Sequence, residues 1–105
     1  MPTFEASDRF WNDFDRLRAD QQQRFFEARD QFIALLLTWE AAGCLGIPRF
    51  PKALGVKSMA AHRNIMEFAW APDGRCTWMY GTPRIPGKVH VIWRRIGTHA
   101  IYNDP

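Results

Sequence analysis

Side chains that could move protons and hold an anion gather in the second half of the chain. His99 follows Arg94 and Arg95 closely, and histidine suits proton transfer near neutral pH. Glu67 could act as a general base or orient another group, and Arg75 could stabilise negative charge. A proton donor, a proton acceptor and nearby cations are what acid–base chemistry at a phosphate group requires.

Each candidate also has a plain structural interpretation. His99 could be a surface histidine at a strand edge. Arg75 follows a tight turn, where it could be solvated or form an exposed cross-strand salt bridge with Glu67, which contributes little. Lys57 could be an ordinary loop lysine or a phosphate ligand. Tyr102 could stack on a base or close the core.

Histidine and cysteine spacing gives no support for a metal site. His62, His90 and His99 match no ligand spacing of a zinc family, and Cys44 and Cys76 form no CxxC pair. We therefore expect no metal and no cofactor, and we interpret both cysteines as reduced structural thiols.

Length and hydropathy bound the architecture. The chain has 105 residues and is 47% hydrophobic, which fits one domain over residues 1–105 with a packed core. Its longest apolar run, Phe32–Leu37, is far shorter than the roughly 18 residues of a membrane span. The start of the chain lacks the basic and apolar regions of a signal peptide. These features predict a cytoplasmic protein without a membrane partner.

Charge divides the chain in two. Residues 1–42 carry five arginines against eight acidic residues, a net charge of −3. Residues 43–105 carry nine Lys and Arg against three acidic residues, a net charge of +6. We expect two surfaces with different partners, and the basic one could attract a polyanion.

The first part of the chain predicts a helical hairpin. Residues 2–5 form a weak candidate strand, Ser7 is a plausible helix N-cap, and a second helix begins near Asp20. Gly43 is a natural helix terminator. Apolar residues recur at helical spacing in both helices: Phe10, Phe14, Leu17, Phe25, Ala28, Phe32, Leu36 and Trp39. Residues 43–63 contain three glycines, two prolines and several cations, which predicts a basic loop.

The last third predicts strands. Residues 64–71 and 75–80 flank Pro72-Asp73-Gly74, a turn in which glycine accepts a positive φ. Residues 88–96 predict a further strand, which Gly97 ends, and residues 99–102 could form a short final one. This order predicts an α+β fold, with the hairpin packed on a three- to four-stranded antiparallel sheet.

Alternation within these strands separates two faces. One face holds Phe68, Trp78 and Trp93, so we expect core packing for the tryptophans, Trp70 included, and for Cys76 beside Trp78. The other face collects ionisable residues, which we interpret as an open surface: Glu67, Arg75, Lys88, His90 and Arg94.

The C-terminal segment Trp93–Tyr102, with Gly97-Thr98-His99, resembles the last strand of RelE/ParE-superfamily toxins, especially the YafQ-like mRNA interferases. Residues 65–68 and 73–80 look like the central hairpin of that superfamily, and residues 54–57 look like the segment before it. The two-helix front half matches in pattern only. The specific part of the resemblance comprises about ten residues.

This resemblance implies a RelE-like fold and a metal-independent, ribosome-dependent mRNA endoribonuclease with a cognate antitoxin as partner. The 2′-hydroxyl of the RNA would attack the adjacent phosphate. By position, His99, Arg75 and Tyr102 correspond to catalytic residues of the family, whereas Glu67 has no fixed counterpart. Lys57, Arg94 and Arg95 would bind phosphate.

Two functions stay open at this point. The first is the endoribonuclease, with His99 and Glu67 in proton transfer. The second is a binding protein, either a ParE-like inhibitor of DNA gyrase without nuclease activity or an inactive homologue that only binds its antitoxin. The histidine in the tail favours the nuclease. The sequence does not define base preference, oligomeric state or the antitoxin.

Overall fold

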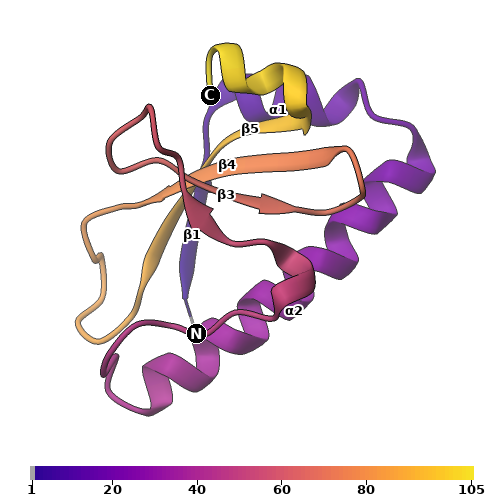
Figure 1. The fold of residues 1–105 in the computed structure, drawn as a ribbon. Helices are drawn as coiled ribbons and strands as arrows, with labels where there is room; N and C mark the ends of the chain where they lie inside the picture. Colours follow the sequence, from indigo (N-terminus) through magenta and orange to yellow (C-terminus); the bar gives the residue numbers. More distant parts are fainter. Residues whose placement is uncertain (1) are drawn as a thin grey trace.

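A five-stranded sheet organises the molecule, with its strands in the order β1-β5-β4-β3-β2. The structure is a computed structural model and describes residues 2–105. The strands are β1 (Thr3–Ala6), β2 (Lys57–Ser58), β3 (Met66–Ala69), β4 (Gly74–Tyr80) and β5 (His90–Thr98). Helices α1 (Asp8–Asp15) and α2 (Ala19–Ala41) lie between β1 and β2 in the sequence. The short 3₁₀ helices are η1 (Lys52–Leu54) and η2 (His99–Asn103), and Figure 1 shows how these elements follow one another.

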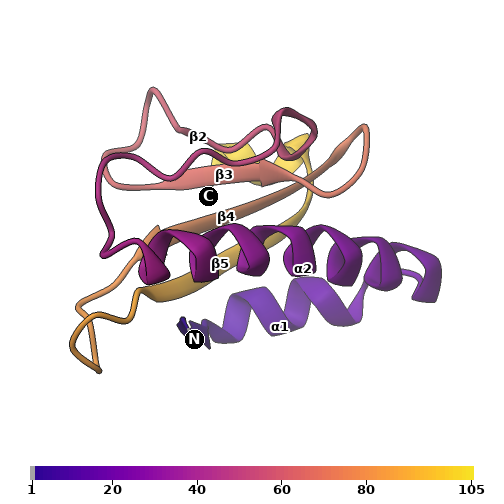
Figure 2. The ribbon, with the colours of Figure 1, turned by 90° about the horizontal axis from the view of Figure 1, so that it is seen from below.

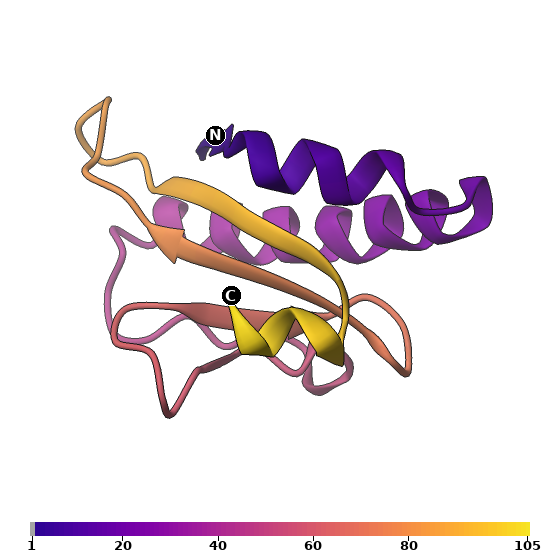
Figure 3. The same cartoon turned by 90° about the horizontal axis from the view of Figure 1, so that it is seen from above.

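Both long helices lie along one face of the sheet, and η2 lies over the other (Figures 2 and 3). The Ser7 hydroxyl accepts a hydrogen bond from the Phe10 amide, 3.1 Å away, so the predicted N-cap of α1 is confirmed. Helix α2 ends at Ala41, and Gly43 follows with a φ of +80°. Glycine tolerates this left-handed conformation, which is why the helix terminates here.

The core forms between α2 and the helical face of the sheet. The predicted stripe of α2 is buried and packs on strand residues, with Phe32 at the centre. Its ring lies edge-on to Trp78 at a centroid distance of 4.8 Å and stacks on Phe68 at 5.5 Å. Trp70, Trp78 and Trp93 are all buried, so their predicted core role is confirmed.

Two strands differ from the prediction. β1 pairs with β5 in parallel, with Thr3 opposite His90, so the sheet is mixed rather than purely antiparallel. β2 forms inside the segment predicted as a basic loop, and Lys57 pairs with Glu67 of β3. Thr3 and His90 are 87 residues apart, and an irregular loop separates Lys57 from Glu67, so local patterns reveal neither pairing.

The predicted final strand over residues 99–102 is wrong, because these residues form η2. The Thr98 hydroxyl accepts a hydrogen bond from the Ala100 amide at 3.2 Å and caps the helix. Gly97 does not end β5 but pairs with Arg75 within it. A Cβ on Gly97 would lie 3.0 Å from Ile101, so glycine lets η2 fold back closely onto the sheet.

The predicted open ionisable face is therefore partly covered. Glu67 is only 5% exposed and His90 only 3%. These two residues lie in different parts of the face, because Glu67 contacts η2 through Tyr102 whereas His90 contacts β1 through Thr3. None of the helices in residues 2–105 is long and apolar enough to cross a membrane.

Candidate active site

The turn between β3 and β4 places a carboxylate against the predicted catalytic histidine. The Nδ1 atom of His99 lies 2.5 Å from Oδ1 of Asp73. The hydrogen bond from His99 is the main reason that the pKa of Asp73 is lowered. The His99 side chain is 49% exposed, so its other ring nitrogen can meet a ligand.

Gly74 shapes this turn for a reason other than the one predicted. It does not adopt a positive φ. A Cβ at this position would lie 2.5 Å from the Trp70 ring, a distance that real contacts do not reach. Glycine is thus needed because the buried indole packs against the backbone where β4 begins.

Tyr102 joins this histidine to a second carboxylate. In a 3₁₀ helix the residues at i and i+3 share one side, and the rings of His99 and Tyr102 meet edge-on at a centroid distance of 5.2 Å. The Tyr102 hydroxyl donates to Oε1 of Glu67 at 2.7 Å. The short helix η2 therefore brings both side chains to one face of the sheet.

Glu67 is the buried centre of the arrangement, with its side chain 7% exposed. Nζ of Lys57, on the neighbouring strand, lies 3.7 Å from Oε1. Burial, followed by the hydrogen bond and charge of Glu67, raises the pKa of Tyr102 to about 12. Tyr102 is accordingly a neutral phenol at physiological pH and a lasting hydrogen-bond donor.

These contacts form a continuous line, which we call the η2 cluster: Asp73, His99, Tyr102, Glu67 and Lys57. Four of its members were predicted as site residues. Asp73 was not, because a Pro-Asp-Gly sequence already explains an aspartate as a turn residue. Its position 26 residues from His99 left no local signal.

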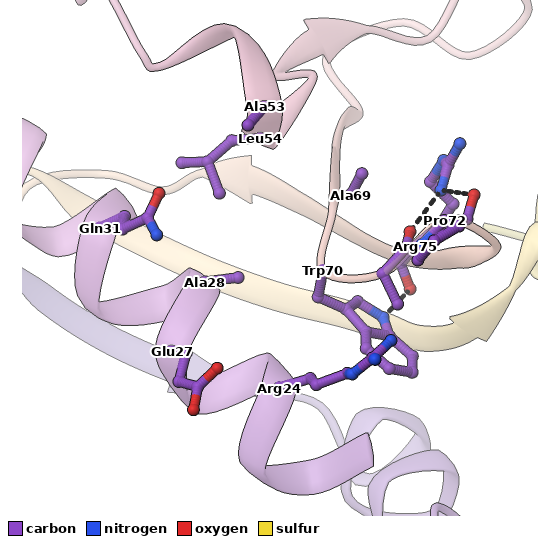
Figure 4. A pocket seen from close by; sticks show the side chains of 11 residues that line it. Arg24, Glu27, Ala28, Gln31, Ala53, Leu54, Ala69, Trp70, Pro72 and Arg75 are labelled. Carbon is purple, nitrogen blue, oxygen red and sulfur yellow. Dashed lines mark hydrogen bonds between the residues drawn. The ribbon is translucent and has the colours of Figure 1, made fainter. Parts of the chain in front are cut away.

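Arg75 lies beside the cluster but serves the turn. Its Nη1 donates to the carbonyls of Ala71, Pro72 and Gly74 at 2.9–3.2 Å, and Figure 4 shows this guanidinium over the turn. Arg75 also counteracts the rise in the pKa of Tyr102, so its positive charge reaches the cluster. The alternative of a cross-strand salt bridge to Glu67 is wrong, because that carboxylate pairs with Lys57.

Arg94 and Arg95 lie outside the cluster and hold other parts of the chain. Arg95 makes two hydrogen bonds to the carboxylate of Asp13, at 2.7 and 3.0 Å, and Asp13 is the main reason that the pKa of Arg95 is raised. Arg94 donates to the carbonyl of Pro105 at 3.1 Å. Their role as phosphate ligands stays a prediction, and the observed contacts brace α1 and the end of the chain.

The three histidines do not gather. His90 lies on β5 beside β1 with both ring nitrogens engaged. His62 lines a hollow together with Lys57, Glu67 and Tyr102. Within residues 2–105 no group of three or more His, Cys, Asp or Glu side chains could hold a metal ion. Cys76 is fully buried on the helical face as predicted, and burial raises the pKa of its thiol well above normal.

Two hollows lie near these residues, one lined by members of the η2 cluster and the other lined by Arg75. One, of about 440 Å³, lies next to Lys57, between the segment 57–62 and the pair Glu67 and Tyr102. The other, of about 510 Å³, lies between α2 and the β3–β4 turn. Figure 4 shows Arg24 of α2 reaching across this second hollow toward Trp70. Both hollows adjoin residues that bear charge.

Comparison with known proteins gives a match at the level of structure. No protein-family model and no curated protein sequence matches the chain. YafQ from E. coli strain BL21(DE3) is similar with a TM-score of 0.58 and 16% identity, over 97% of this chain and 98% of YafQ.

Two further structures show the same likeness. In the E. coli DinJ–YafQ toxin–antitoxin complex the TM-score is 0.50 at 18% identity, over 94% of this chain and 93% of the other. A copper-bound mutant toxin from Helicobacter pylori gives 0.56 at 14% identity, over 95% and 97%. The predicted α+β class and the RelE-like fold are confirmed, although the sheet has five strands rather than the predicted three or four.

Proposed function

We propose that the chain is the toxin of a toxin–antitoxin pair and cleaves messenger RNA in the cytoplasm without a metal ion. The observation that carries this proposal is the η2 cluster, in which an exposed histidine and a buried carboxylate flank one tyrosine. A fold alone does not define an activity. The histidine and the carboxylate, held on either side of the tyrosine, support proton transfer at two neighbouring atoms of an RNA substrate.

His99 supplies the proton to the leaving group in this proposal. The Asp73 carboxylate accepts the hydrogen bond from Nδ1–H, which fixes the orientation of the ring and leaves Nε2 facing outward. This is the function of the aspartate in a Ser-His-Asp triad, where a carboxylate orients the imidazole. Nε2 is then the atom that gives a proton to the 5′-oxygen.

Glu67 takes the proton from the attacking 2′-hydroxyl. Both of its contacts use Oε1, and among the described residues Oε2 has no hydrogen-bond donor. As the O2′–P bond forms and the P–O5′ bond breaks, the 2′ proton passes to Oε2. The products are a 2′,3′-cyclic phosphate and a 5′-hydroxyl.

Two cations compensate the charge of the phosphate. Lys57 is bound to Glu67 at one end of the cluster, with its side chain 70% exposed. Arg75 stands beside Tyr102, and only its Nη1 is used by the turn. Cations placed before the reaction stabilise the crowded phosphorane without reorganising. Arg94 and Arg95 would extend this surface along the RNA.

The partner surface proposed for the antitoxin is the helical hairpin. An apolar hollow of about 420 Å³ lies between β1, α1 and α2, and the rings of Phe4, Phe14 and Phe26 line it. Trp11 at its rim is 52% exposed. An apolar segment of an antitoxin would cover these rings. The similar fold of YafQ in the DinJ–YafQ toxin–antitoxin complex supports an antitoxin as the partner.

The test compares the wild-type chain with the variant His99→Ala. We expect single-turnover cleavage of ribosome-bound message to slow by about 10²–10⁴-fold in the variant. RNA binding should change little, because one histidine is a small part of a polyphosphate footprint. Cleavage should survive excess chelator. In cells, growth arrest should follow expression of the wild type and be relieved by the product of the neighbouring gene.

The opposite results would remove the proposal. Cleavage that is unchanged in His99→Ala, or that chelator alone abolishes, contradicts this mechanism. Growth arrest with intact transcripts would favour a binding protein such as a gyrase inhibitor. A chain that neither cleaves RNA nor arrests growth would be an inactive homologue.

A further inference from the structure

The hollow beside Lys57 is a preformed feature of the chain. It has a volume of about 440 Å³, within the range of roughly 300–1,000 Å³ that small-ligand sites occupy. Its wall is the loop between β2 and β3, closed by hydrogen bonds from Met59 N to Ile65 O (2.9 Å) and from His62 N to Met59 O (3.3 Å). Its other wall is Glu67 and Tyr102.

The lining of the hollow has the chemistry that a planar heterocycle needs. The Tyr102 ring and the His62 imidazole offer flat π-surfaces, and unpaired bases of RNA stack on such side chains. Met59, Ala60 and Ala61 supply apolar contact, with the thioether adapting to shape. His62 adds a polar edge that can donate or accept a hydrogen bond.

We propose that this hollow binds the nucleobase of the nucleotide on the 5′ side of the cleaved bond. The inference rests on the proposed function. The evidence for the position of the base comes from the covalent structure of ribose. The base is attached to C1′ and the attacking hydroxyl to C2′, so the two groups sit on adjacent carbon atoms. If Glu67 takes the proton from O2′, the base must lie in the space around Glu67. That space is the hollow.

The order of residues in the η2 cluster supports this direction. Glu67 and Lys57 line the hollow, whereas His99 lies across the Tyr102 ring and is bound to Asp73 of the β3–β4 turn. The nucleotide that leaves with O5′ would therefore extend toward the turn, away from the hollow. The loop 59–62 thereby determines which base precedes the cut.

The experiment fills the hollow and reads the cut sites. The variant Ala61→Phe places a ring in the space, and Ala34→Phe, at an exposed position of α2, is the matched control. Far-UV circular dichroism checks that both variants fold. Sequencing of cleaved ends should show a base preference at the 5′ position that Ala61→Phe reduces about tenfold, with Ala34→Phe like the wild type. His62→Ala, which enlarges the hollow and removes its polar edge, should change the preferred base.

A second measurement works without cleavage. The His99→Ala variant is titrated with a short single-stranded RNA, and the methyl signals of Met59, Ala60 and Ala61 are followed by NMR. These signals should shift with intact RNA and return when the RNA is abasic at one position. Signals that stay unmoved, or that shift equally with abasic RNA, would overturn the inference. So would identical cut-site distributions in the wild type and Ala61→Phe.

The two proposals fail separately. Cleavage that depends on His99 but has no base preference linked to the loop would leave the proposed function standing and remove the nucleobase site. If the wild type does not cleave RNA, the nuclease proposal falls and the hollow cannot be the site beside a cleaved bond; base-dependent methyl shifts would then show only that it binds a nucleobase.

Discussion

Two histidine–carboxylate pairs lie on the same face of the sheet and differ in almost every physical respect. His90 is buried on β5 beside β1, where Nδ1 lies 2.7 Å from the Thr3 hydroxyl and Nε2 lies 2.8 Å from Glu5. Among residues 2–105, His99 uses only Nδ1, on Asp73, and its side chain is half exposed. A histidine with both nitrogens engaged fixes structure, whereas one with a free nitrogen can exchange protons with a ligand.

The elements that hold the two pairs explain the difference. His90 belongs to β5 and faces Glu5 of the adjacent strand β1, so sheet pairing sets its contacts. His99 begins η2 after the strand has ended, and its partner lies in a turn. Binding and catalytic groups occur often in such connections, which a rigid scaffold positions.

The largest difference that we expect between the two histidine–carboxylate pairs is the effect of changing Asp73 on the rate of cleavage. We expect Asp73→Asn to lower the rate of the cleavage step by up to about 10²-fold, because an imidazole with a weakened anchor leaves its productive orientation. RNA affinity should stay close to that of the wild type. Single-turnover kinetics at saturating message separate these quantities. The matched control is Glu5→Gln in the other pair, and a similar loss of rate in both variants would contradict the distinction.

A smaller difference is expected in stability, where changing His90 should matter more than changing His99. His90→Ala removes a buried imidazole and leaves the half-buried Thr3 hydroxyl without its ring partner, so we expect the free energy of unfolding to fall by about 1–3 kcal/mol. His99→Ala removes an exposed contact and should cost less than about 1 kcal/mol. Urea denaturation measures both. Equal destabilisation by the two variants would show that His99 is also a structural residue.

Local patterns predicted the elements that depend on neighbouring residues. Ser7 as a cap and the apolar stripe of α2 follow from spacing along a few turns, and the structure has both. The parallel pairing of β1 and the contact of Arg95 with Asp13, 82 residues away, depend on the whole topology. No periodicity within one segment could have revealed them.

The candidate site divides in the same way. Residue types and resemblance identified His99, Glu67, Arg75 and Tyr102, but not the order in which they meet. Residues 99–102 were predicted as a short strand, but the Thr98 hydroxyl caps the Ala100 amide and a 3₁₀ helix forms instead. Once η2 forms, the spacing of three places His99 and Tyr102 side by side.

The smallest expected effect concerns the titration of Tyr102, which reports whether its bond to Glu67 exists. Both tyrosines have raised pKa values, and burial is the main cause in each. In a Tyr80→Phe background only Tyr102 remains, and its phenolate absorbance should develop near pH 12 rather than 10. Because the folded-state pKa is raised, the stabilisation that Tyr102 contributes is complete below about pH 10. It is lost as the pH rises from there toward 12.

Adding Glu67→Gln to this background isolates the contribution of the carboxylate. The neutral amide removes the charge that opposes phenolate formation, so the pKa of Tyr102 should fall. It should stay above 10, because burial by η2 and the sheet persists and is the larger cause. Tyr102→Phe in the same background should abolish the absorbance change. A pKa of Tyr102 that Glu67→Gln leaves unchanged would mean that the phenol and the carboxylate are not in contact, and the η2 cluster would lose its centre.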